Sequence, residues 1–240
     1  MNFFFNRSKI VIDCLTTNIN AFDYFPIQKS AAFYPNWWKN LPKYNNVQHP
    51  NGLEINKSTM KGCDGLLSLY SQGFMIPIWS DLVIETLGTN YRYQFADETS
   101  TVGHHDLQQM SQEFGNYIHV KIQSPWRLKE NKGIKFAFIQ PSYNQVKTLL
   151  DWHVLPGVVD FKYQSATNIN LICAKGRRFE IAAGLPMAQL VPLTEKEIDL
   201  RLHMVDFDNV EHKRMLNNHY PFFVGSHRKL KKILDGKKGG

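Results

Sequence analysis

Short runs in which apolar and polar residues alternate recur along the chain, and this two-residue period predicts β-strands. In one run Tyr91, Tyr93 and Phe95 alternate with polar residues, and Gly88-Thr89 supplies a turn, so a hairpin is predicted over 81–95. Further strands are predicted at 9–15, 73–79, 117–123, 134–140, 154–163, 168–174, 178–181 and 187–193. Short strands at this spacing favour a mainly β fold, an antiparallel β-barrel or sandwich.

Helices are predicted at few places. Prolines 26, 35 and 42 limit the aromatic segment 20–45 to one short turn around Trp37. The remaining interpretations are a loop at 43–56, short helices at 61–72 and 209–218, and either a strand or a helix at 195–205. We therefore expect one β-rich domain over 1–205, with the segment 20–45 packed on it, and a short helical, basic C-terminal extension over 206–240.

The composition fits an ordinary folded domain, because 43% of the 240 residues are hydrophobic, 13% are aromatic and 20% are charged. These values exclude a disordered, collagen-like or coiled-coil chain. No run of about 18 apolar residues occurs, so we expect no membrane contact. The apolar start 1–7 is too short for a signal peptide, and its charge follows the apolar run, so we expect no secretion. Three scattered cysteines make neither a disulfide framework nor a zinc motif.

The positive charge is concentrated at the C-terminal end. The net charge is +7, and the last 30 residues hold eight basic and two acidic residues, which leaves the rest nearly neutral. Leu230, Ile233 and Leu234 have helical spacing, and the cations around them are Arg228, Lys229, Lys231 and Lys232. This basic tail is a candidate for weak contact with nucleic acid or with an acidic protein surface. The alternative is a solvated terminal helix.

One histidine-rich segment contains a metal-type spacing. His104 and Asp106 form an H-x-D pair, and His153 follows 49 residues after His104. Two histidines and a carboxylate on a β-barrel are the ligand set of iron and 2-oxoglutarate oxygenases, with His105 as an alternative ligand. The pattern is common by chance in a chain with nine histidines, and Asp106 equally fits the N-cap of a helix. We therefore expect no metal and no cofactor.

A second segment, 155–163, reads L-P-G-V-V-D-F-K-Y. It resembles the third motif of the trimeric dUTPases, and residues 179–191 are similar to a late strand of that family. The resemblance implies a jelly-roll or dUTPase-like fold in which Asp160 activates water and Tyr163 packs on the deoxyribose. The family's phosphate motif, its glycine after the tyrosine and its Gly-rich C-terminal arm have no counterpart here. Asp160 could equally cap its own turn.

The five tryptophans each stand beside Pro, Ser or Asp at the end of a predicted element. Exposed tryptophans stack on sugars, bases or proline-rich partners, whereas buried ones close the ends of a sheet structure. Trp37, Trp38 and Trp126 are the candidate binding residues.

Several segments occur in the same order as in a β-rich protein family of tailed phages and some bacteria, and the chain is similar to that family over about residues 30–195. They are P-x-W-W-K-x-L-P at 35–42, S-P-W at 124–126, G-V-V-D at 157–160 and A-G-x-P-x-A-Q-L-V-P at 183–192. The resemblance implies a phage or prophage setting and brings no reaction with it. We therefore expect a phage-encoded, non-catalytic β-barrel protein with a binding or virion-assembly role. A protein partner or self-association into an oligomer is expected, in the host cytoplasm or on the virion. A dUTPase-like enzyme and an iron oxygenase are the alternatives.

Overall fold

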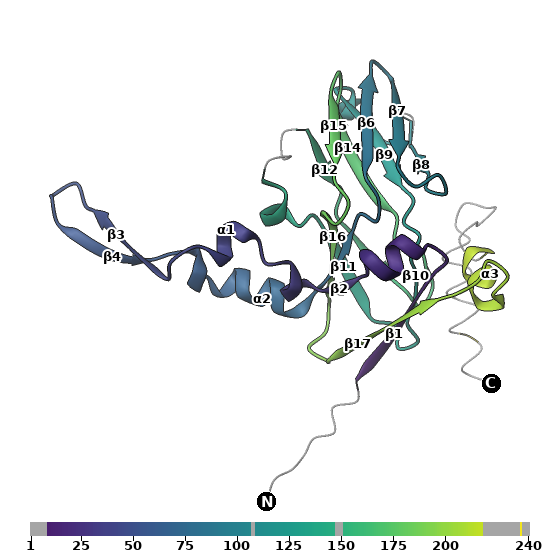
Figure 1. Cartoon of the computed structure of the whole chain (residues 1–240), viewed down its shortest axis with the longest axis horizontal. Helices are drawn as coiled ribbons and strands as arrows, with labels where there is room; N and C mark the ends of the chain where they lie inside the picture. Colours follow the sequence, from purple (N-terminus) through teal and green to yellow (C-terminus); the bar gives the residue numbers. More distant parts are fainter. Residues whose placement is uncertain (1–8, 107–108, 147–150, 218–235, 237–240) are drawn as a thin grey trace, which may run out of the picture.

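The structure is a computed structural model that describes residues 9–106, 109–146, 151–217 and 236. It is mainly β, as the alternating pattern predicts (Figure 1). The strands are β1 (Ile10–Thr16), β2 (Gln28–Lys29), β3 (Tyr44–Gln48), β4 (Glu54–Ser58), β5 (Phe74–Pro77), β6 (Leu82–Leu87), β7 (Asn90–Phe95), β8 (Val102–Gly103), β9 (Tyr117–Ile122), β10 (Arg127–Lys129), β11 (Lys135–Ile139), β12 (Trp152–Val154), β13 (Gly157–Asp160), β14 (Ile169–Ala174), β15 (Arg178–Ile181), β16 (Pro186–Pro192) and β17 (Ile198–Met204). The α-helices are α1 (Asn36–Lys39), α2 (Asp64–Gln72) and α3 (Val210–Asn217), and the short helical turns are η1 (Asn20–Tyr24), η2 (Ser30–Phe33), η3 (Met60–Gly62), η4 (Gln112–Phe114) and η5 (Ser142–Asn144).

Four sheets form the body of the molecule. Their strand orders are β13-β11-β16-β5-β2, β12-β14-β9-β8, β15-β6-β7 and β10-β1-β17. Neighbouring strands are antiparallel except β1 and β17, which are parallel. Each sheet ends in two different strands, so the described residues form a sandwich-like arrangement and not the closed barrel that was the other expectation.

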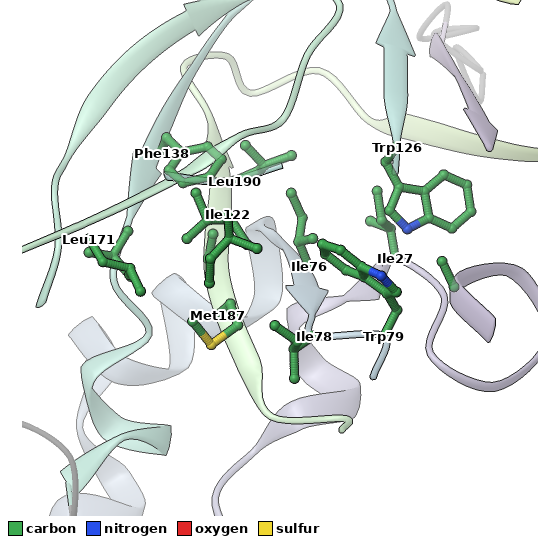
Figure 2. Packing of buried hydrophobic residues seen from close by; sticks show 14 of the residues in the cluster. Ile27, Ile76, Ile78, Trp79, Ile122, Trp126, Phe138, Leu171, Met187 and Leu190 are labelled. Atoms are coloured by element: carbon green, nitrogen blue, oxygen red, sulfur yellow. The ribbon is translucent and has the colours of Figure 1, made fainter. Parts of the chain in front are cut away.

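The core lies where the apolar faces of these sheets meet. Ile76 of β5, Phe138 of β11 and Leu190 of β16 belong to the same buried cluster as Ile122 of β9 and Leu171 of β14 (Figure 2). Along β9 the side chains alternate, with Ile118, Val120 and Ile122 inside and Tyr117, His119 and Lys121 on the other face. Burial of one apolar face per sheet is what fixes the strand register.

Three local predictions need correction. Residues 43–56, expected as a loop, contain most of the hairpin β3–β4. The long strand expected over 154–163 is divided at Leu155-Pro156 into β12 and β13, which join different sheets. The undecided segment 195–205 is the strand β17, and it pairs with β1 over the whole of that strand.

The helix α3 packs against the body beside β10. The ammonium of Lys129 lies 2.6 Å from a carboxylate oxygen of Glu211, and the Ser165 hydroxyl donates to the carbonyl of Met215 at 3.1 Å. Met215 and His212 are buried in this contact. The basic tail with Arg228, Lys229, Lys231 and Lys232 lies outside the described residues. Among the helices that the structure does describe, none is long and apolar enough to cross a membrane.

Candidate functional site

The first candidate surface is the arm, residues 36–62, which extends away from the body (Figure 1). Its base is a stack of aromatic rings. The ring centroids of Trp38 and Tyr34 are 4.2 Å apart, and those of Tyr34 and Tyr70 of α2 are 4.7 Å apart. The Lys61 ammonium lies 4.2 Å from the Trp38 ring centroid and donates to the carbonyls of Trp38 and Lys39. These contacts hold the two ends of the arm together.

The outer part of the arm is the hairpin β3–β4, in which all ten strand residues are exposed. Val47 and Ile55 face each other across the two strands, and Leu53 in the connecting loop is 63% exposed. Among the described residues, neither strand pairs with any strand other than its hairpin partner. An isolated two-stranded hairpin is at best marginally stable in water, and its open edges are templates for another strand. The arm therefore presents two unpaired strand edges and an exposed apolar pair outside the body.

Of the candidate binding tryptophans, two lie at the base of the arm. Trp37 is 40% exposed, and its indole N–H donates to the carbonyl of Tyr143 at 3.0 Å. Trp38 is half-buried in the aromatic stack. The assignment of Trp126 to a binding surface is wrong, because its side chain is 0% exposed within the main core cluster.

The second candidate surface lies on the outer face of the sheet β12-β14-β9-β8. Two clefts meet here, cleft A of about 660 Å³ and cleft B of about 520 Å³, and His105, His119 and Met110 line both. The strand alternation places His119 and Lys121 on this face, together with Asn170, which lies opposite Lys121 on β14. The loop after β8 brings His105 over the strand, with its ring centroid 4.5 Å from that of His119.

Hydrogen bonds fix the proton positions on both rings. The backbone N–H of His105 donates to Nδ1 of His119 at 3.0 Å, so the neutral His119 ring carries its proton on Nε2. The side-chain oxygen of Gln109 accepts from the backbone N–H of Asp106 at 3.3 Å and lies 3.2 Å from Nδ1 of His105. Nδ1 of His105 is therefore the donor, which leaves its Nε2 as an acceptor when the ring is neutral. The pair offers one donor and one acceptor on neighbouring rings.

Burial, together with the smaller effects of the nearby His105, Lys121 and His104, lowers the pKa of His119 from 6.5 to about 4. His119 is therefore neutral in the folded protein at pH 7, whereas the unfolded chain binds a proton near pH 6.5. The stabilisation that comes from burying a neutral His119 is fully present above pH 6.5. It is lost as the pH falls from 6.5 towards 4, because in this range the unfolded chain binds a proton that the folded protein does not. We expect an NMR titration of the ring to have its midpoint near 4, and the variant His119→Asn to lose less stability than wild type between pH 7 and 5. A ring that titrates near 6.5 would contradict this.

The proposed iron ligands are not brought together. His104 packs edge-on against Tyr91 in the lining of cleft A, with ring centroids 5.8 Å apart. Asp106 accepts the backbone N–H of Gln109 at 3.0 Å and so caps a turn, and among the described residues no helix follows it directly. His153 is exposed on β12, and Ile172 of β14 separates it from His119. Within the described ranges, no group of three or more His, Cys, Asp or Glu side chains is placed to hold a metal ion.

The dUTPase-like residues lie at a turn. A carboxylate oxygen of Asp160 accepts the backbone N–H of Lys162 at 3.1 Å, and the Asp160 carbonyl accepts from Tyr163 and Gln164. Tyr163 is buried, with the Lys162 ammonium 4.8 Å from its ring centroid. This is the geometry of an aspartate that caps its own turn.

Comparison with known proteins adds no family or function. A scan against protein-family models and a search of curated proteins found no match to the chain. The resemblance to the phage family therefore stays a prediction from the co-linear segments. Sequence reasoning selected His105 but not His119 or the arm hairpin. The outward position of His119 in the predicted strand 117–123 was the signal that it could face a site.

Proposed function

We propose that this chain is a phage-encoded, non-catalytic binding protein with a role in assembly, and that it associates through the arm. The observation that carries the proposal is the hairpin β3–β4, which is exposed along its whole length and has two open edges. Evolution usually protects such edges with charge, proline or a covering element. The ten strand residues of the hairpin hold only Glu54 and Lys57 as charged residues, so its strands are left open.

The partner that we propose is a second copy of the chain. Strand addition needs an open edge on the receiving side, and the body offers one in β13, the outermost strand of the five-stranded sheet. Val158 in the middle of β13 is 61% exposed. The near-neutral hairpin favours a protein edge over the phosphate backbone of nucleic acid as its partner. We propose that the protein is located in the host cytoplasm and that its assembled form is carried on the virion.

We expect the molar mass in solution to fall when charges are placed on the apolar face of the hairpin, and to stay unchanged when they are placed on the opposite face. Val47 and Ile55 form an apolar cross-strand pair, whereas Asn46 and Asn56 form a polar pair on the opposite face. The double variant Val47→Glu/Ile55→Glu should be a monomer because the charges oppose burial against a partner. The matched variant Asn46→Glu/Asn56→Glu, with the same added charge, should keep the mass of the wild type. Light scattering after size-exclusion chromatography measures both.

Two outcomes would contradict this proposal. A wild-type chain that is monomeric at every concentration up to about 10⁻³ M would exclude self-association of functional strength. An oligomer that is equally lost in both double variants would show that added charge acts generally, without a specific contact through the apolar pair. A circular dichroism melt of each variant identifies any general loss of folding.

A further inference from the structure

We propose that clefts A and B form one binding site for a small anionic ligand that carries a planar ring. This inference is independent of the arm and of its partner. The two clefts share the His105–His119 pair as a common wall. Their volumes, about 660 and 520 Å³, are those of small-molecule sites, which usually span about 300–1,000 Å³.

The shared wall supplies directional hydrogen bonds. The His119 ring is anchored through Nδ1 by the His105 amide, so its Nε2–H is left to donate towards the clefts that the ring lines. A donor held in one tautomer at a buried position selects an acceptor such as a phosphate or carboxylate oxygen. The Nε2 atom of His105 accepts from a ligand hydroxyl or N–H group at the same wall.

Each cleft also contains one lysine. Lys175 lines cleft A and Lys121 lines cleft B. Two ammonium groups and a neutral His119 favour a ligand with negative charge, and Asp106 at cleft A is the one carboxylate among the lining residues of either cleft. A phosphate group accepts hydrogen bonds from both kinds of donor that line the clefts, the lysine ammonium groups and the fixed N–H group of His119.

The rest of the lining accounts for the planar ring. Cleft A has aromatic walls, and the rings of Tyr91 and Tyr93 are stacked with centroids 6.2 Å apart beside His104. Phe114 and Tyr117 line the same cleft. Aromatic faces of this kind stack on planar groups whatever their hydrogen-bonding pattern.

The test uses phenyl phosphate as the probe. Benzoate and inorganic phosphate are the comparison compounds, which separate the effect of the ring from that of the phosphate group. The full chain is titrated with each compound by isothermal calorimetry and by NMR of ¹⁵N-labelled histidine. We expect saturable binding of phenyl phosphate that shifts the His119 ring signals. Inorganic phosphate should bind at least about tenfold more weakly because it lacks the ring. If benzoate binds as tightly as phenyl phosphate, the ligand is still an anion with a planar ring, and a carboxylate is as good an anionic group as a phosphate.

Variants separate binding from folding. His119→Asn keeps an oxygen that accepts the His105 amide and removes the Nε2–H donor, and we expect it to bind phenyl phosphate at least about tenfold more weakly. Lys121→Met and Lys175→Met should each weaken binding, whereas Lys57→Met on the arm is the matched control and should not. The proposal is overturned if phenyl phosphate, benzoate and phosphate all fail to bind, or if the three cleft variants bind phenyl phosphate as the control does.

Discussion

Replacing Glu130 with alanine is expected to lower the free energy of unfolding by about 3 kcal/mol or more. Glu130 follows β10 and is 1% exposed, so its carboxylate is almost completely buried. One of its oxygens accepts the backbone N–H of Lys132, and the other accepts those of Gly133 at 2.6 Å and Ile134 at 2.9 Å. Removing the buried carboxylate leaves the three backbone donors of the turn without their acceptor.

The turn itself explains why no other residue can take over this role. Gly133 has a φ of +77°, a conformation that side chains disfavour, and it sets the direction in which the chain enters β11. The three N–H groups converge on the two oxygens of one carboxylate because the backbone folds around it. The acid therefore specifies the turn that joins β10 to β11, and β11 is an inner strand of the five-stranded sheet, between β13 and β16.

Urea unfolding monitored by circular dichroism measures this effect. Glu130→Gln keeps one acceptor oxygen and presents an amide N–H group to the remaining donors, so its loss should be intermediate. Glu98→Ala is the control, since Glu98 is exposed and belongs to no strand. If Glu130→Ala unfolds at the same urea concentration as this control, the hydrogen bonds at the turn do not stabilise the fold.

Period-two alternation was sufficient to predict the strands that have one buried and one exposed face. β14 is an example, since its residues alternate between buried and partly exposed, and in β9 the core residues Ile118, Val120 and Ile122 occupy every second position. The hairpin β3–β4 was missed because it has no buried face, so nothing in its polar, Asn-rich sequence alternates with burial. Its strands are identified by pairing alone, and pairing is a property of the folded chain.

The candidate sites were harder to predict for a related reason. The H-x-D spacing of His104 and Asp106 suggested a shared metal, but the two side chains have separate contacts, with Tyr91 and with Gln109. The partner of His105 is His119, which lies across a loop and on a neighbouring strand. Spacing along the sequence reports neighbours within one element, whereas this pair depends on how the loop after β8 crosses β9.

The second large expected effect is the loss of stability when the buried Trp126 is replaced. Trp126→Ala should lower the free energy of unfolding by about 3–5 kcal/mol, because a fully buried indole leaves a cavity that the surrounding sheets cannot fill. Trp37→Ala should cost less than about 1 kcal/mol, because Trp37 is exposed and makes one hydrogen bond, to Tyr143. Urea unfolding of both variants measures the difference.

A third variant distinguishes the volume of Trp126 from its polar group. The indole N–H of Trp126 is buried and has no acceptor among the described residues, so it contributes no hydrogen bond that a substitution would break. Trp126→Phe keeps an aromatic ring in the core and removes this unpaired donor, and we expect it to cost less than half as much as Trp126→Ala. Equal losses in the two variants would mean that the N–H is paired after all. If Trp126→Ala lowers the free energy of unfolding no more than Trp37→Ala does, Trp126 is not buried in the core, and it becomes a candidate binding residue again.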